Sequence, residues 1–160
     1  TEFVPLPFVA SEAPIYLKGR ARRGPTFREA VLMHAVARLA LHPHISNIQT
    51  SWVKMGPDGV KACLNAGAND LGGTLMNETI TRAAGAEHGQ EMPPEAMEAM
   101  IRAIGRTPVQ RTTFYGEPPA AQIKASFDAS DLGGVTNTPA RRYERKAKPT
   151  LYRPGLNAAE

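Results

Sequence analysis

The sequence contains a single cysteine, Cys63, among 160 residues. One thiol excludes a disulfide within the chain and is typical of proteins in a reducing compartment, so we expect a cytoplasmic protein. Cys63 is surrounded by Ala62, Leu64 and Ala66. This apolar context predicts a buried, unreactive thiol rather than a nucleophile or a metal ligand.

Long hydrophobic runs are also lacking. The longest candidate, residues 31–41, is interrupted by His34 and Arg38 and falls short of the roughly 18 to 20 apolar residues that cross a bilayer. We therefore expect no membrane partner. The chain opens with Thr1-Glu2-Phe3, with no initiator methionine and no basic start before an apolar run. These features predict no secretory signal and a piece of a longer protein.

Aromatic residues make up 6% of the chain, and its net charge is +4. Positive charge gathers in two stretches, Lys18, Arg20, Arg22, Arg23 and Arg28 in the first, and Arg141, Arg142, Arg145, Lys146, Lys148 and Arg153 in the second. A basic tail of this kind is usually solvated. Neither an aromatic stacking pattern nor a groove-reading helix accompanies it, so nucleic acid is not the expected partner.

Strand-like and helix-like patterns alternate along the first 120 residues. Strands are predicted at residues 2–8, 47–53, 68–71 and 109–115, and helices at residues 27–41, 57–66, 76–83 and 94–104. Thr26 and Glu29 form a capping box before the first of these helices, and His42-Pro43 ends it. A short helix fits residues 120–127, and irregular chain is expected from residue 128.

This alternation predicts parallel βαβ units. Polar residues recur within the predicted strands, as at Gln49, Ser51, Asp70, Arg111 and Thr113. They fit the lumen face of a barrel better than a doubly wound sheet, whose strands are apolar on both faces. We therefore predict an α/β fold, half of a TIM-type (β/α) barrel with about four βα units, over residues 1–120. Residues 121–160 are predicted to form an irregular, flexible tail.

Residues 65–78 (NAGANDLGGTLMNE) concentrate short polar side chains and adjacent glycines behind the helix that ends at Gly67. Glycine lets the backbone approach a ligand closely, and polar loop residues at a strand end are suited to binding. Asn, Asp and Gly are also the usual residues of turns. Composition therefore leaves both a binding loop and a plain turn open.

Several short segments of the sequence resemble those of a known family. They are Glu2 to Phe8, Glu12 to Arg23, the capping-box helix, Asn47 to Gly56, Ala66 to Gly85, His88-Gly89 and Arg111-Thr112-Thr113. Together they resemble the C-terminal half of the radical S-adenosylmethionine enzymes of deazaflavin biosynthesis, the CofH type, which in actinobacteria forms the C-terminal part of the fused FbiC protein. The word Ala-Asn-Asp-Leu-Gly-Gly-Thr at residues 68–74 belongs to this branch, which includes menaquinone-pathway enzymes of the futalosine type.

The resemblance implies a 4-hydroxybenzyl transfer from tyrosine to 5-amino-6-(D-ribitylamino)uracil. In the family, a 4Fe-4S cluster cleaves S-adenosylmethionine to a 5′-deoxyadenosyl radical, which starts the breakage of the tyrosine Cα–Cβ bond. The partners it implies are these two substrates, the N-terminal half-barrel of the same enzyme and the partner deazaflavin synthase module. The family's CxxxCxxC motif is absent from this sequence, and one cysteine cannot hold such a cluster. We therefore expect no metal site and no activity from this piece alone.

Barrel enzymes bind ligands at the C-terminal ends of their strands, and this rule selects the candidate residues. They are Pro7, Glu12, Ser51, Asn69, Asp70, Gly72, Gly73, Thr74, Glu78, His88 and Arg111. Carboxylates suit an ammonium group or hydroxyls, arginine suits a carboxylate, and amides suit a uracil edge. Each has a structural alternative: Asp70 could cap the following turn, and Arg111 could pair with a barrel carboxylate. Trp52 and His34 are expected to pack in the core.

Three other readings remain open from the sequence. The first is a related menaquinone-pathway enzyme of the aminofutalosine or dehypoxanthine futalosine type. The second is a different barrel enzyme, in which Gly72-Gly73-Thr74 cradles a phosphate, as late barrel loops often do. The third is a non-enzymatic module whose basic tail binds nucleic acid.

Overall fold

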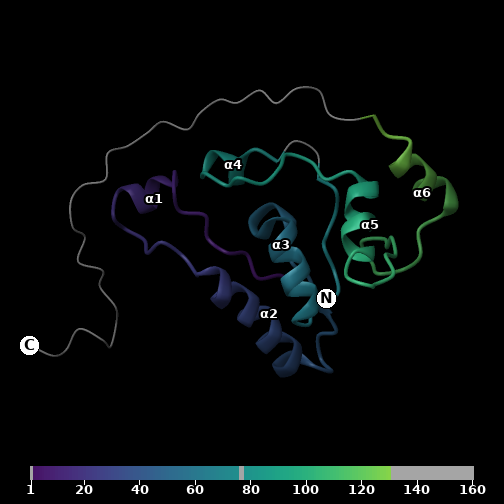
Figure 1. Ribbon diagram of the computed structural model, residues 1–160, viewed down its shortest axis with the longest axis horizontal. Coiled ribbons are helices and arrows are strands. Elements are labelled where there is room, and N and C mark those ends of the chain that lie inside the picture. Colours follow the sequence, from purple (N-terminus) through teal and green to yellow (C-terminus); the bar gives the residue numbers. More distant parts are fainter. Residues whose placement is uncertain (1, 76–77, 131–160) are drawn as a thin grey trace, which may run out of the picture.

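The computed structural model describes residues 2–75 and 78–130 (Figure 1). These residues form a mixed α/β structure with two short strands and six helices. In chain order the elements are β1 (Glu2–Phe3), α1 (Pro14–Leu17), α2 (Phe27–Leu41), β2 (Asn47–Ile48), α3 (Trp52–Asn65), α4 (Ile80–Ala83), α5 (Pro94–Arg102) and α6 (Ala120–Phe127). Among them, no helix has both the length and the hydropathy needed to cross a membrane. The predicted tail lies outside these residues from 131 onward.

The strands are parallel, as predicted, but the strand predicted over residues 2–8 is wrong after Phe3, since β1 contains only Glu2 and Phe3. Glu2 pairs with Asn47 and Phe3 with Ile48, and an isolated parallel bridge joins Gln49 to Asp70. Three segments therefore lie side by side in chain order: β1, β2 and the stretch around Asp70. Side chains alternate between the two faces of a strand. Ile48 and Thr50 point into the core, where both are fully buried, and Gln49 points to the opposite face.

Helix α2 forms as the sequence predicted. The Thr26 hydroxyl accepts a hydrogen bond from the Glu29 backbone N–H at 3.2 Å, and the Glu29 carboxylate accepts one from the Thr26 N–H at 2.7 Å. This reciprocal pair satisfies two of the N–H groups that a helix start leaves without partners. The helix ends at Leu41, directly before His42-Pro43, because proline disfavours helical backbone in the residue before it.

The predicted strand 47–53 is wrong in its second half. Only Asn47 and Ile48 are strand, and helix α3 begins at Trp52. The buried Trp52 indole donates a hydrogen bond to the Gly73 carbonyl at 2.9 Å, which ties the first turn to the following loop. At Gly56 the backbone leaves the helical region (φ 64°, ψ 177°). The predicted helix over 57–66 corresponds to the part after this break.

Two other predicted strands do not form. Residues 68–71 contribute the single bridge at Asp70. Residues 109–115 end in a turn closed by hydrogen bonds between Thr112 and Gly116, and Tyr115 has a positive φ of 62°. Val109 and Phe114 are 77% and 95% exposed. An extended segment with such exposure has no packed neighbour to hold it in a ladder, and β propensity depends on that packing.

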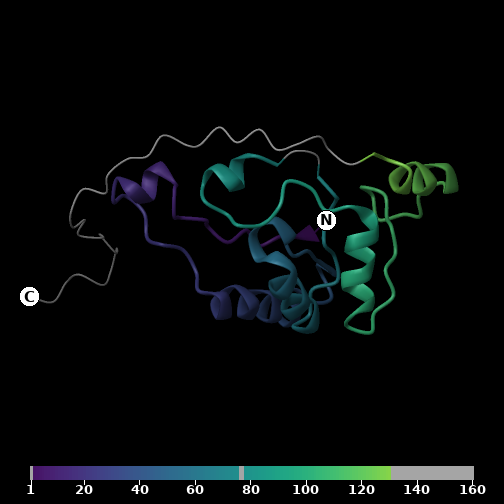
Figure 2. The ribbon, with the colours of Figure 1, turned by 45° about the horizontal axis from the view of Figure 1, so that its top comes forward.

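Later helices match the prediction in place but are shorter. The structure has α4 at Ile80–Ala83 where a helix over 76–83 was predicted, and residues 76–77 lie outside the described part. Helix α5 ends at Arg102 rather than 104, and α6 forms at Ala120–Phe127. Figures 1 and 2 show α2, α3 and α5 arranged side by side in chain order, with α3 in contact with both neighbours.

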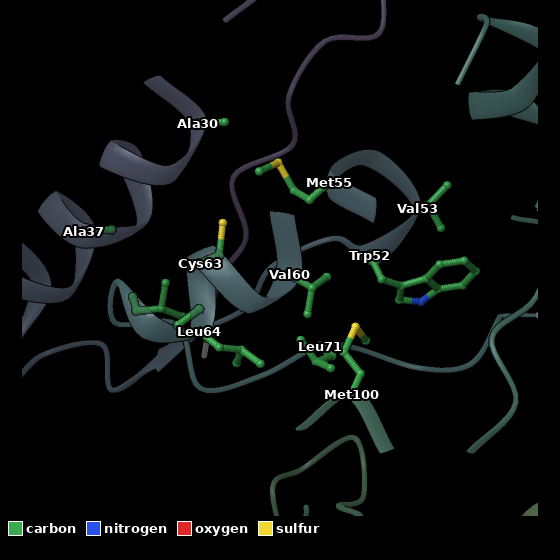
Figure 3. Close-up of a cluster of buried hydrophobic side chains, with 12 residues drawn as sticks. Ala30, Ala37, Trp52, Val53, Met55, Val60, Cys63, Leu64, Leu71 and Met100 are labelled. Atoms are coloured by element: carbon green, nitrogen blue, oxygen red, sulfur yellow. The ribbon is translucent and has the colours of Figure 1, made fainter. Parts of the chain in front are cut away.

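The core lies between α2, α3 and the inner face of β2 (Figure 3). Ile48, Val60 and Cys63 are fully buried. Trp52 packs here as predicted, at 3% exposed. His34 also lies in the core, where its Nδ1 is 2.8 Å from the Ala30 carbonyl oxygen and 3.5 Å from Cys63 Sγ.

Arg38 joins α2 to the segments of the sheet. Its guanidinium donates to the carbonyl oxygens of Gly67 and Ser46 and to the Asn69 side-chain oxygen, each at 2.7 Å. The same Asn69 oxygen accepts from the Ile48 backbone N–H at 2.9 Å. One amide therefore fixes the third segment against both β2 and α2.

Replacing Arg38 by alanine is expected to destabilise the chain by about 2–3 kcal/mol, because three hydrogen bonds from a charged group are lost. The measurement is the free energy of unfolding from urea titration followed by circular dichroism. Arg28→Ala on the same helix is the matched control, since Arg28 is exposed, and should change that free energy by less than about 0.5 kcal/mol. Equal effects of the two substitutions would contradict this role of Arg38.

Candidate functional site

Four polar side chains from four segments meet on the face of the sheet that points away from helices α2 and α3. Glu2 comes from β1, Gln49 follows β2, Asp70 lies in the third segment and Arg111 lies beyond α5. Arg111 Nε donates to Asp70 Oδ2 at 2.5 Å, and its Nη2 lies 3.4 Å from Gln49 Oε1 and 3.6 Å from Glu2 Oε2. We call these four residues, with Tyr115, the polar row.

Tyr115 closes the polar row at its far end. Its hydroxyl donates a hydrogen bond to Glu2 Oε2, and its ring lies under the Arg111 guanidinium, with Cζ 4.2 Å from the ring centroid. Such a cation–π contact is favourable. Burial, followed by the hydrogen bond to Glu2, raises the pKa of Tyr115 to about 12. The phenol therefore stays protonated at neutral pH and acts as a donor.

Asp70 and Arg111 are paired with each other inside the polar row, whereas Glu2 stays partly exposed. The Asp70 side chain is 8% exposed and the Arg111 side chain 28%. Hydrogen bonding to Asp70 raises the pKa of Arg111, so its charge is permanent. Asp70 Oδ1 accepts from the Gly72 N–H at 2.7 Å, so both oxygens of this carboxylate are engaged. Two carboxylates oppose one guanidinium, and the row carries a net negative charge.

Glycine is required at position 72, because a side chain there would collide with a member of the polar row. Its φ is +72°, and a Cβ there would lie 2.7 Å from Gln49 Nε2. Glycine adopts this conformation without the cost that other residues carry. The Gln49 amide is therefore held between Gly72 and Arg111, with its oxygen toward the guanidinium and its NH₂ group toward the glycine loop.

Among the predicted site residues, the structure brings Asp70, Gly72 and Arg111 together. Both structural alternatives raised from the sequence are present: Asp70 caps the turn at Gly72, and Arg111 pairs with a carboxylate. Asn69 points to the helix side, where its oxygen meets Arg38 and the Ile48 N–H. Ser51 precedes α3 and makes no side-chain cap.

Four further candidates lie in loops and make hydrogen bonds to residues outside the polar row. Glu12 donates its backbone N–H to the Ala84 carbonyl at 2.9 Å. The Glu78 carboxylate accepts from the Thr81 N–H and hydroxyl, both at 3.0 Å. Gly73 and Thr74 accept through their carbonyls from Trp52 and Met92.

His88 and Pro7 lie in different places. The His88 ring is packed against Gly56, where a Cβ would come within 2.3 Å of His88 Nε2. Pro7 lies in the extended chain after β1 and lines an apolar groove beside α2. The connection that carries His88 therefore rests on the break in α3, and Pro7 is not part of the polar row.

Three members of the polar row were not among the predicted site residues: Glu2, Gln49 and Tyr115. The sequence held a signal for Gln49, because it alternates with the buried Ile48 and Thr50. Glu2 and Tyr115 meet across 113 positions of the chain. No local pattern indicates such a contact.

The described residues do not fit an iron–sulfur cluster. They contain no group of three or more His, Cys, Asp or Glu side chains placed to hold a metal ion. Cys63 is fully buried, and burial raises the pKa of its thiol, which opposes formation of a thiolate ligand. Burial likewise lowers the pKa of His34. These two residues belong to the core, as the sequence predicted.

Two comparisons with known proteins, one with family models and one with individual sequences, agree with each other. The family model described as CofH/MqnC C-terminal region matches residues 1–124. An FO synthase of Streptomyces avermitilis is 53% identical over 131 residues, which is 82% of this chain and 15% of that protein. An FO synthase of Mycobacterium leprae is 57% identical over 115 residues, 72% of this chain and 13% of that protein.

A third relative is named 5-amino-6-(D-ribitylamino)uracil–L-tyrosine 4-hydroxyphenyl transferase and comes from Methanopyrus kandleri. It is 58% identical over 115 residues, which is 72% of this chain and 31% of that protein. The chain thus spans between 13% and 31% of the length of these three relatives. No solved structure matches.

Replacing Asp70 by alanine is expected to lower the free energy of unfolding by about 3–5 kcal/mol, because Arg111 loses its nearest carboxylate in a partly buried position and the Gly72 N–H loses its acceptor. Urea titration measures this loss. Asp58→Ala is the matched control: Asp58 pairs with Lys61 at 3.6 Å, but its side chain is 96% exposed. That pair should contribute less than about 1 kcal/mol. Equal losses in the two variants would contradict the structural role of Asp70.

The free energy of unfolding is expected to fall in strong base, because Tyr115 loses its proton there. Its pKa in the folded chain is about 12, above the ordinary value near 10. The unfolded chain therefore loses this proton first, so the contribution is complete below about pH 10 and disappears as pH rises toward 12. Ultraviolet difference titration of the chain against Tyr115→Phe measures the pKa. A difference curve with its midpoint near 10 would contradict the burial of this phenol.

Proposed function

Because the chain belongs to the CofH/MqnC C-terminal region family, we propose that it supplies substrate-binding structure to an enzyme that transfers the 4-hydroxybenzyl group of L-tyrosine to 5-amino-6-(D-ribitylamino)uracil. The observation that carries the proposal is the family match over residues 1–124, which contains the whole polar row. The name of the M. kandleri relative supports this pair of substrates.

We propose that the described elements form the C-terminal half of a TIM-type barrel, with the polar row facing its lumen. Three adjacent parallel segments in chain order support this arrangement. The helices α2, α3 and α5 follow one another on one side of these segments (Figure 2). Polar side chains gather on the other side, where barrel enzymes hold their ligands. The other half-barrel and the partner deazaflavin synthase module are then its protein partners.

Within the polar row we propose different roles for the charged groups. Arg111 acts as a positioning residue, because its donors already meet Asp70, Gln49 and Glu2. Glu2 is available to a substrate ammonium or hydroxyl, since its side chain is 37% exposed and the row has excess negative charge. The Gln49 amide both donates and accepts, which matches a uracil edge or ribityl hydroxyls.

The loops supply the remaining contacts in this proposal. Gly72, Gly73 and Thr74 follow Asp70 directly and border the same face. We propose that the connections that carry Glu12, Glu78 and His88 reach over this face in the complete barrel. No role in the transfer of a proton or a group is assigned to any of them.

The iron–sulfur cluster and S-adenosylmethionine belong to the family's chemistry, and the described residues do not fit the cluster. We propose that the part of the longer enzyme outside this chain holds it, so no reaction step is assigned to residues here. A cytoplasmic location is part of the same proposal. It is supported by the single buried thiol, which requires no oxidising compartment.

The family description leaves one second candidate. It includes MqnC, so a menaquinone-pathway enzyme that acts on a futalosine-type substrate is the alternative. The printed names of the relatives favour the first function. A phosphate site at Gly72-Gly73-Thr74 is disfavoured, because Asp70 already occupies the Gly72 N–H and would repel an anion. The basic tail proposed for nucleic acid lies outside the described residues.

A chimera tests the proposed function. The 115 matched residues of the M. kandleri transferase are replaced by those of this chain, and hydroxybenzylation of 5-amino-6-(D-ribitylamino)uracil is followed by mass spectrometry. We expect kcat/KM within about tenfold of the parent, a loss of no more than about 1.4 kcal/mol of transition-state stabilisation. Gln49→Leu in the chimera should raise KM for the uracil about tenfold, since a polar contact is lost.

The chimera also separates the two candidates. Its controls are iron content and a far-ultraviolet spectrum, which show that the protein is folded and loaded. A folded, loaded chimera that produces no adduct would overturn the proposal. Turnover of a futalosine-type substrate by the same protein would establish the menaquinone alternative instead.

A further inference from the structure

An open apolar groove lies beside α2, on the side of the sheet opposite the polar row. It has a volume of about 930 Å³, and its apolar lining includes Phe3, Leu6, Phe8, Ile15, Met33 and Val36. Leu6, Met33 and Val36 are 62%, 50% and 51% exposed. These residues form one contiguous surface, and contiguous apolar surfaces of this kind mark interaction sites.

The groove lies next to the open edge of β1. In the described part of the chain β1 pairs with β2 alone, so its other edge has unpaired backbone groups, which native sheets cover or pair. Crossovers between parallel strands are almost always right-handed and place their helices on a consistent face. A strand added to the open edge of β1 would therefore bring its helix to the face that carries α2, beside α2, where the groove lies.

The rim of the groove is positively charged. Arg22 lines it, and Arg20 and Arg23 are exposed in the same loop, between α1 and α2 (Figure 1). The acidic residue of the lining, Glu29, is held by the Thr26 cap. Cap hydrogen bonds, followed by the charge of Arg22, lower the pKa of Glu29. Glu29 is therefore ionised and offsets the charge of Arg22, whereas Arg20 and Arg23 leave the loop with excess positive charge. This excess favours an apolar occupant that carries acidic residues toward the loop.

We propose that this groove binds an amphipathic helix of a neighbouring βα unit, supplied by the part of the longer enzyme outside this chain, with the strand of that unit paired to β1. Acidic side chains of the helix face Arg22 and its neighbours. The inference rests on the proposed half-barrel and names the surface through which its halves meet. The M. kandleri relative has more than twice as much chain outside the matched region as within it, since the match covers 31% of it.

A second copy of this chain is a poorer occupant. A two-fold dimer places the same surface of each copy against itself. Both sides of such an interface would carry the same basic loop, and neither would supply acidic residues to face Arg22. A helix with acidic residues has no such conflict.

The test combines affinity with cross-linking. The 160-residue chain is co-expressed with the remainder of the M. kandleri transferase as a separate polypeptide, and the complex is purified. We expect Val36→Glu to weaken the complex by at least about tenfold, because a charge is placed in an apolar contact. Arg22→Glu should weaken it less and remove its dependence on salt.

Leu39→Glu is the matched control: Leu39 is an apolar residue of α2, 82% exposed and outside the groove lining. Its substitution should change the affinity less than twofold. A photo-reactive residue at position 33 should cross-link to one apolar helix face of the remainder, while the same probe at position 39 should not. Cross-links to a second copy of this chain, or equal effects at positions 36 and 39, would overturn the proposal.

If the remainder does not fold as a separate polypeptide, the two substitutions are made at the matched positions of the full-length M. kandleri transferase. The one matched to Val36 should lower the melting temperature and expose the junction to protease, and the one matched to Leu39 should do neither. Equal melting temperatures would overturn the inference. Neither measurement needs turnover, so failure of docking is distinguishable from failure of the proposed reaction.

Discussion

The structure depends on the way in which Asn69 and Asp70, adjacent in sequence, point to opposite faces. The Asn69 oxygen takes hydrogen bonds from Ile48 and Arg38 and so sets the third segment against β2 and α2. Once that register is fixed, Asp70 must face the other way, since side chains alternate along an extended chain. A structural amide on the helix side thereby places a carboxylate on the site side.

The polar row follows from the position of Asp70. Its two oxygens engage Arg111 and the Gly72 N–H, and Arg111 then reaches Glu2 and Gln49. The stretches around Asp70 and Arg111 are connected to β1 by side chains rather than by a continuous backbone ladder. Arg111 therefore serves the order of the polar row. In the proposed function, the excess negative charge of the row and the exposure of Glu2 would favour a ligand that carries an ammonium group or hydroxyls.

Local chemistry made much of this predictable from sequence. The Thr26 and Glu29 capping box and the stop at Pro43 act within one helical turn, and they located α2 at both ends. The strand patterns misled because Trp52 and Arg111 respond to distant partners. Trp52 begins a helix and its indole donates a hydrogen bond to the Gly73 carbonyl, and Arg111 lies just before a turn, where it pairs with Asp70. Asp70 and Arg111 were selected as candidate site residues by their type and their place in the sequence, whereas Glu2 and Tyr115 join the polar row through a contact that only the fold creates.

The packing of His88 on Gly56 has a consequence for how the chain can vary. The imidazole fills the space that a side chain at position 56 would occupy, although the two residues lie in different elements. The two positions thus share a single volume. Position 56 is restricted twice over, because its φ of 64° is one that side chains other than glycine rarely adopt and because the ring of His88 already fills the space beside it. The break in α3 is thus held by one backbone conformation and by one imidazole from a connection that lies more than thirty residues further along the chain.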